Sequence, residues 1–254
     1  AGWLIGPLAG GYLVFLGVGN VFLLAGLVTL LAVGLVQLMI ADPLPVSGEA
    51  RSFWHALSKE NSLSLIKVKS LQPLLIYHLL FNLGLNLFYE FYPFWLVEKF
   101  HFNSSEIGLS TVAITLSMIA GSIYVVPRLA GRVDSLFVVT AGSLMLSVLF
   151  MLLPLANLLG MAVVFAACGL VIALTSGVFP AYVAARFGEL GQGRVMGLLT
   201  TNFCLGNVIA AIGGSFIALM GSGWSLFCGG ILCLLSTMWI QRVRQSTDDQ
   251  SIIV

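Results

Sequence analysis

The sequence contains very few charged side chains. Its 254 residues include 11 Lys and Arg and 10 Asp and Glu, only 8% of the chain, against roughly 25% in an ordinary soluble domain. So few charges cannot cover the surface of a soluble domain of this size, which argues against a soluble enzyme and a disordered protein. The net charge of +1 provides no basic field for a polyanion, so we expect no nucleic-acid partner.

Motifs of metal sites and enzymes are also missing. The four cysteines (Cys168, Cys204, Cys228 and Cys233) lie in apolar runs without CxxC pairing or a neighbouring His cluster, as is typical of small buried residues. The rival class is an intramembrane enzyme, but the sequence has no HExxH, no G-x-S-x-G and no phosphate loop. We therefore expect no metal, no cofactor and no enzymatic activity.

Long hydrophobic runs are what the sequence has instead. Hydrophobic residues make up 59% of the chain, and the mean hydropathy is +1.05. A helix needs about 20 mostly apolar residues to cross a bilayer, and eight segments of this kind occur, the first of them short. The expected spans are residues 1–17, 20–41, 73–97, 107–127, 135–156, 158–185, 194–220 and 224–243. The predicted fold is an all-α, polytopic membrane helix bundle.

Basic residues are distributed unequally between the two sides of these spans. One side carries only Lys99; the alternate connections carry Arg51, Lys59, Lys67, Lys69, Arg128, Arg132, Arg186, Arg194, Arg242 and Arg244. By the positive-inside rule, the long loop and the C-terminus are cytoplasmic. The compartment is a plasma membrane, most simply a bacterial inner membrane, and we expect the tail at 244–254 to be disordered beyond its first turns.

The two ends of the chain resemble each other. Gly10-Gly11 precedes one apolar span, and Gly213-Gly214 precedes another at the far end. Spans one and two thus match spans seven and eight, so the repeat is six spans long. Two six-helix halves are a transporter architecture.

This repeat predicts how the chain is organised. Residues 1–41 would be the last two helices of an N-terminal half, 42–72 a cytoplasmic linker and 73–243 the C-terminal six-helix half. Within the linker, Phe53 and Trp54 alternate with polar residues, which predicts a short amphipathic helix on the membrane. Because the first span begins without Met or a polar flank, we expect a chain truncated at its N-terminus, with a processed N-terminus as the alternative.

Three short motifs resemble the major facilitator superfamily. The first has the pattern G-x-x-x-G-P-x-x-G-G and consists of Gly2, Gly6, Pro7, Gly10 and Gly11; it resembles the antiporter motif of the family's fifth helix. Residues 100–108 are similar to the loop before helix 8 of tetracycline-efflux-type drug–proton antiporters. Residues 191–197 are similar to the segment that opens helix 11 in the same exporters. The chain would then cover helices 5–12 of twelve.

The resemblance implies a function. It implies alternating access of two helical halves and export of a small amphipathic organic molecule in exchange for protons, by a protein that is monomeric when full length. A proton-coupled importer of a nutrient or organic ion is the alternative, and a non-transporting partner or truncated remnant is a third. The glycine motif would form a pliant helix between the halves, or serve plain packing. The loop with Arg128, Gly131 and Arg132 lacks the acidic residue that often precedes it in the family, so the resemblance does not extend to a charge-relay gate there.

Polar residues form a ridge on the span at 73–97. His78, Asn82, Asn86 and Glu90 are spaced four apart, so the ridge drifts about 40° per step and rises about 18 Å in all. An ionisable residue inside a membrane is costly and usually faces a cavity or a partner. We expect Glu90 to face a central cavity and bind a cation, a cationic substrate or a proton; the alternatives are snorkelling to the outer head groups and pairing with Lys99.

Further candidates surround this ridge. His78 titrates near neutral pH when exposed, but it lies close to the cytoplasmic end, which favours an interfacial role. Asn82, Asn86 and Asn202 either contact substrate or bond a neighbouring helix. Phe88 and Tyr89 are the aromatic residues that we expect to line a cavity for amphipathic organic molecules.

Overall fold

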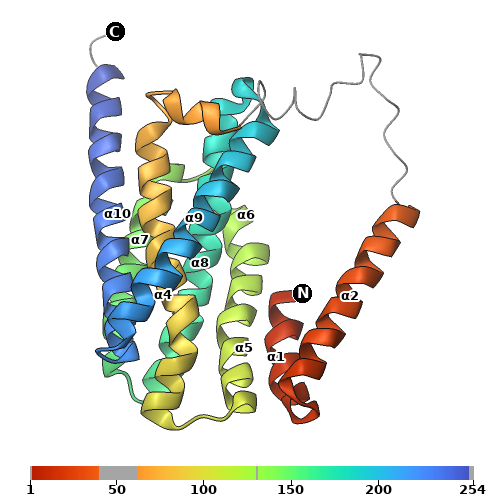
Figure 1. The fold of residues 1–254 in the computed structure, drawn as a ribbon. Helices are drawn as coiled ribbons and strands as arrows, with labels where there is room; N and C mark the ends of the chain where they lie inside the picture. Colours follow the sequence, from red (N-terminus) through yellow and green to blue (C-terminus); the bar gives the residue numbers. More distant parts are fainter. Residues whose placement is uncertain (1, 40–61, 130, 252–254) are drawn as a thin grey trace.

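The structure is a computed structural model that describes residues 2–39, 62–129 and 131–251, and in these residues all regular elements are helices (Figure 1). The main helices are α1 (Gly2–Leu13), α2 (Val18–Met39), α4 (Gln72–Phe100), α5 (Ser104–Ala120), α6 (Val126–Leu129), α7 (Ser135–Leu152), α8 (Leu158–Phe187), α9 (Gln192–Ala218) and α10 (Ser222–Ser251). Short helical turns are η1 (Val14–Leu16), η2 (Ser62–Lys67), η3 (Gly121–Val125), η4 (Leu153–Leu155) and η5 (Gly188–Leu190). The expected all-α membrane fold is confirmed.

Most of the expected spans are present as long helices. Seven helical segments of the described residues are long and apolar enough to cross a membrane: Val18–Met39, Gln72–Phe100, Ser104–Leu129, Ser135–Leu155, Leu158–Leu190, Gln192–Ala218 and Ser222–Arg242. The expected first span corresponds to α1, which has 12 residues. At 1.5 Å per residue α1 is about 18 Å long, shorter than a bilayer core of about 30 Å.

Helices α4 to α10 pack into one bundle (Figure 1). The helix α4 packs against α9 and α10, α7 packs against α10 and α8, and α5 packs against α8. The helix α1 lies against the outer side of α5, whereas α2 extends away and has no buried residue. The core of the bundle therefore sits around α4, α7 and α8.

The loop before α5 is held by its own side chains. Asn103 Oδ1 accepts a hydrogen bond from Glu106 N at 3.0 Å, and Glu106 Oε2 accepts one from Asn103 N at 2.7 Å. This is a capping box, which satisfies two backbone donors that a helix start otherwise leaves unpaired. The segment at 100–108, which resembles an exporter loop, thus has a local structural role.

Two expectations about the connections meet different outcomes. In the tail at 244–254 we expect disorder beyond the first turns; residues 252–254 lie outside the described residues, and α10 continues through about two turns of the tail to Ser251. The physical reason is that neither Gly nor Pro follows Gly230 in this helix, so nothing in the sequence stops it. The expected amphipathic helix around Phe53 and Trp54 lies outside the described residues.

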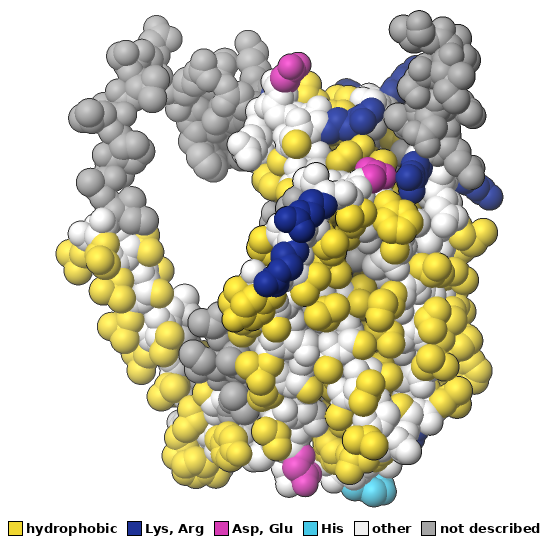
Figure 2. Space-filling view, turned by 180° about the vertical axis from the view of Figure 1, so that it is seen from behind, with side chains coloured by type: hydrophobic (Ala, Val, Ile, Leu, Met, Phe, Trp, Pro, Cys, Tyr) yellow, Lys and Arg dark blue, Asp and Glu magenta, His cyan; other side chains and the backbone are white. Residues whose placement is uncertain are grey.

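Charged side chains gather at one end of the molecule. Figure 2 shows Lys and Arg mainly near the upper end, above a broad belt of hydrophobic side chains. That end holds the start of α4 and the C-terminus (Figure 1). Such a belt between polar ends is the surface that a bilayer requires, and the chain is an integral membrane protein.

The bundle also depends on close contacts between helix backbones. Gly84 on α4 faces Gly229 on α10, and a Cβ atom built at Gly84 would lie 2.6 Å from Gly229 O and 2.7 Å from Cys233 Sγ. No side chain fits there without moving a neighbouring helix. Small residues allow such approach, which is how membrane helices gain packing contacts without a hydrophobic driving force.

We expect Gly84→Ala to destabilise the bundle by about 1–3 kcal/mol, because the added methyl overpacks the α4–α10 contact. The measurement is the thermal unfolding midpoint in detergent. Gly213→Ala on α9 is the matched control, since a Cβ there meets no atom within 4 Å, and it should be neutral or stabilising. Equal midpoints for the two variants would contradict the tight contact.

Candidate functional site

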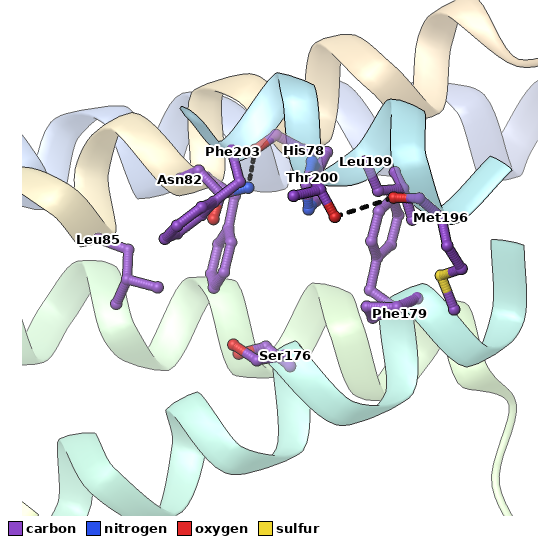
Figure 3. Close-up of a pocket in the computed structure, with 12 residues that line it drawn as sticks. His78, Asn82, Leu85, Ser176, Phe179, Met196, Leu199, Thr200 and Phe203 are labelled. Carbon is purple, nitrogen blue, oxygen red and sulfur yellow. Dashed lines mark hydrogen bonds between the residues drawn. The ribbon is translucent and has the colours of Figure 1, made fainter. Parts of the chain in front are cut away.

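A cavity of about 310 Å³ lies between α4, α8 and α9, and Figure 3 shows side chains of these helices converging on it. Its lining residues are His78, Phe81, Asn82, Leu85, Thr175, Ser176, Phe179, Pro180, Met196, Leu199, Thr200 and Phe203. The volume is at the lower end of the range for small-molecule sites. We call this cavity the inner pocket.

His78 is positioned by all three helices of the inner pocket. It comes from α4, and its ring stacks on Phe179 of α8 with centroids 5.2 Å apart and planes 13° apart. Its Nδ1 lies 3.2 Å from Nδ2 of Asn202 on α9, and the same Asn202 nitrogen donates to Leu75 O at 2.9 Å. Asn202 therefore bonds a neighbouring helix and positions His78.

These contacts assign the tautomer of His78. Leu75 O can only accept, so the Asn202 atom beside it is the amide nitrogen, which can only donate. His78 Nδ1 must then be the acceptor and carries no proton. The imidazole is neutral with its proton on Nε2, which leaves an N–H donor on a residue that lines the inner pocket.

The two asparagines of the polar ridge have different surroundings. Asn82 donates from Nδ2 to His78 O at 2.7 Å and lines the inner pocket (Figure 3). Asn86, one turn further, is buried against Gly206 of α9, where an added Cβ would lie 3.4 Å from Asn86 Nδ2. That Nδ2 has no hydrogen-bond partner in the described part of the chain. Asn86 thus belongs to the α4–α9 contact.

Two aromatic residues near the outer part of the ridge depart from our expectations. Phe88 was expected to line a cavity but is fully buried in the core, stacked on Phe150 with centroids 4.6 Å apart. Tyr89 is half-buried and donates to Met118 Sδ at 3.6 Å, so it contacts α5 and does not line the inner pocket. Neither residue shares the face of the ridge, because at about 100° per residue Phe88 lies roughly 200° round the helix from Asn86, and Tyr89 lies about 100° from Glu90.

Glu90 is half-buried and does not line the inner pocket. Pairing with Lys99 is not found, since Lys99 Nζ instead donates to Pro154 O at 2.6 Å. In the residues that the structure describes, no hydrogen bond or ion pair to the Glu90 carboxylate is present. Its role as a cation or proton site stays a prediction.

Sequence reasoning missed the aromatic walls of the inner pocket. Both Phe179 and Phe203 follow short polar stretches of otherwise apolar segments: Ser176 precedes Phe179 by three residues, and Asn202 directly precedes Phe203. These interruptions are a local signal, and Ser176 and Thr200 do line the inner pocket, but they do not identify which aromatic side chains face it. Only the packing of α8 on α4 identifies Phe179 as a wall residue.

Comparison with protein families assigns the chain to one of them. A family model described as Major Facilitator Superfamily matches residues 1–211 and, again, residues 74–251. The chain belongs to the major facilitator superfamily. Proteins of this family are membrane transporters, which agrees with the transporter class expected from the sequence. No curated protein matches the chain significantly.

The glycine motif of this transporter chain lies on α1, next to the start of α5. A Cβ atom at Gly11 would lie 2.8 Å from Ser104 O, and Ser105 Oγ donates to Gly11 O at 3.3 Å. Gly6 and Gly10 have no such neighbour within 4 Å in the described structure; Gly2 and Pro7 are also part of α1. The close contact of the motif is therefore made at Gly11.

The connection from α6 to α7 is held by Asp134 and Arg244 in addition to the residues expected from the sequence. Arg128 Nη1 donates to Tyr124 O at 2.6 Å, Gly131 has a φ of +77°, and Arg132 is exposed. Asp134, which follows the loop, accepts from two backbone N–H groups of α7 and pairs with Arg244 of α10 at 3.5 Å. This partly exposed pair adds little stability, about 0–1 kcal/mol, but it joins the loop to α10.

We expect ¹⁵N NMR of the transporter labelled with ¹⁵N-histidine to show His78 protonated on Nε2 and unprotonated on Nδ1. The sequence has 3 histidines, so a His78→Gln variant assigns the signal. Asn202→Leu removes the donor to Nδ1 and should give a mixture of tautomers, whereas Thr201→Val, one residue away on α9, should change nothing. A wild-type signal protonated on Nδ1 would refute the assignment.

Proposed function

We propose that this chain is part of a secondary active transporter that exports small amphipathic organic molecules in exchange for protons. The inner pocket is the observation that carries the proposal. Its walls are largely aromatic and aliphatic, with hydrogen-bonding groups at a few points, notably His78 and Asn82. This mixture is typical of sites for small organic molecules.

The position of the inner pocket fits a transport site. It is formed by three helices, and its α4 residues, His78 to Leu85, lie about 9–20 Å from the start of α4 by helical rise. That start is at the end of the bundle where Lys and Arg gather (Figures 1 and 2), which we propose to be cytoplasmic. A substrate leaving the cytoplasm would meet the inner pocket within the bilayer depth.

The chemistry of the inner pocket favours an uncharged substrate. Its described lining contains no Asp, Glu, Lys or Arg, and burying an unpaired charge there would be costly. The Nε2–H of His78 offers a donor, so a neutral aromatic molecule with a hydrogen-bond acceptor fits best. We propose that the part of the substrate that contacts the inner pocket has this chemistry.

The remaining parts of the proposal rest on the motifs. The resemblance of the α1 glycine motif to the antiporter motif supports export and antiport. We propose that residues 1–41 and 73–243 belong to two halves that rock about a midplane site, joined by a cytoplasmic linker at 42–72. Residues 74–211 fall in both family matches, as an internal repeat would produce. We place the protein, as a monomer, in a bacterial inner membrane.

Removing an aromatic wall should weaken substrate binding. We expect Phe179→Ala to raise the apparent KM for Nile red, a neutral aromatic dye with a carbonyl acceptor, about tenfold, measured in proteoliposomes of the intact transporter. Phe216→Ala is the control, because Phe216 is 70% exposed on α9 and does not line the inner pocket. Equal KM values for both variants would argue against the inner pocket as the substrate site.

Neutralising Glu90 should uncouple transport from protons. If this half-buried carboxylate exchanges the proton, Glu90→Gln will bind the dye normally but lose stimulation of export by an imposed pH gradient, followed with pyranine inside the vesicles. Glu189→Gln, an exposed residue of η5, should keep the stimulation. Unchanged proton coupling in Glu90→Gln would remove this residue from the proposal.

A further inference from the structure

A second cavity lies at the other end of the bundle from the Lys and Arg cluster. Its volume is about 650 Å³, and it is formed by the last turns of α4, by η4 and the end of α7, and by the turn between α9 and α10. It shares no lining residue with the inner pocket. We call it the outer pocket; its charged residues are Glu98 and Lys99.

The two charged groups of the outer pocket are held in place by separate partners. Lys99 Nζ donates to Pro154 O at 2.6 Å and lies 5.3 Å from the centroid of the Trp95 ring. Glu98 Oε2 accepts from the backbone N of Ser222 at 3.0 Å and from the Ser222 hydroxyl. The described ion pairs include none between Lys99 and Glu98.

Each group keeps bonding capacity for a ligand. An ammonium has three N–H donors, so Lys99 has two left after its bond to Pro154. Glu98 has bonded Ser222 through Oε2, which leaves Oε1 as an acceptor. The outer pocket therefore offers one cation and one anion, each held by a separate partner, without net charge.

The wall of the outer pocket is apolar and continues onto the exposed surface. Leu155 is 81% exposed and Trp224 is 52% exposed, and both belong to the outer pocket. In a membrane protein these side chains face lipid, and Trp prefers the level of the head groups. A small water-soluble ligand would leave this wall uncovered, whereas an amphipathic one would cover it.

We propose that the outer pocket binds one phospholipid whose zwitterionic head group carries a primary ammonium. The phosphate would lie on Lys99 and the ammonium on Glu98 Oε1, with the start of an acyl chain along Leu155 and Phe227. An anionic glycerol head group has no ammonium to neutralise Glu98, and a quaternary ammonium has no N–H donor for Oε1. The proposal is independent of the transported substrate.

Native mass spectrometry of the transporter in detergent tests this assignment, with dioleoyl phosphatidylethanolamine, phosphatidylcholine and phosphatidylglycerol added in turn. We expect one ethanolamine lipid to bind about fivefold more tightly than either of the others. Glu98→Gln, whose amide oxygen can still accept from Ser222, should reduce this preference to less than about twofold. Lys99→Gln should weaken all three lipids.

Control variants show whether the lipid preference depends on the outer pocket. Glu189→Gln and Lys69→Gln lie away from the outer pocket and should keep the wild-type preference. Should Lys99→Gln fail to fold, Leu155→Trp fills the exposed wall and is expected to reduce binding of the ethanolamine lipid about fivefold. Equal binding of the three lipids, unaffected by Glu98→Gln, would mean a non-specific lipid annulus and would overturn the proposal. Tight binding of water-soluble phosphoethanolamine, without acyl chains, would overturn it as well.

Discussion

The structure depends on one constraint of the bilayer, which is that a buried polar group without a partner inside the protein costs free energy. The helix α4 shows how this is met. Tyr77 bonds Ser143 of α7 at 2.8 Å, Tyr92 bonds Thr111 of α5 at 2.7 Å, and Trp239 of α10 donates to Pro73 O at 2.9 Å. These bonds tie three neighbouring helices to α4, which is why the rest of the bundle is arranged around it.

The same helix contributes to both candidate sites. The inner pocket uses the first half of α4 and the outer pocket its last turns, while the middle is packed closely at Gly84 against α10. Polar groups that have partners in the core hold neighbouring helices together, as Tyr77 and Tyr92 do. Those that retain bonding capacity at a cavity, such as His78 Nε2 and Glu98 Oε1, are the ones available to ligands.

Part of the candidate site could be predicted from the sequence. The four-residue spacing identified a polar ridge on α4, and two of its members, His78 and Asn82, line the inner pocket. The prediction that Phe88 faces a cavity was wrong, because α7 brings Phe150 against it. Spacing along one helix says which residues share a face, but it does not say which neighbouring helix covers that face.

Composition and hydropathy determined the membrane class, the all-α fold and the approximate limits of most spans, since these follow from the lengths of apolar runs and need no knowledge of contacts. The tertiary structure alone decided which side chains are walls, which are core and which keep free hydrogen-bonding capacity. Phe179 and Phe216 are both phenylalanines in apolar helices, yet one is 2% exposed at the inner pocket and the other is 70% exposed. Their difference arises from long-range helix packing, which sets the partners of each side chain and leaves no mark in the local sequence.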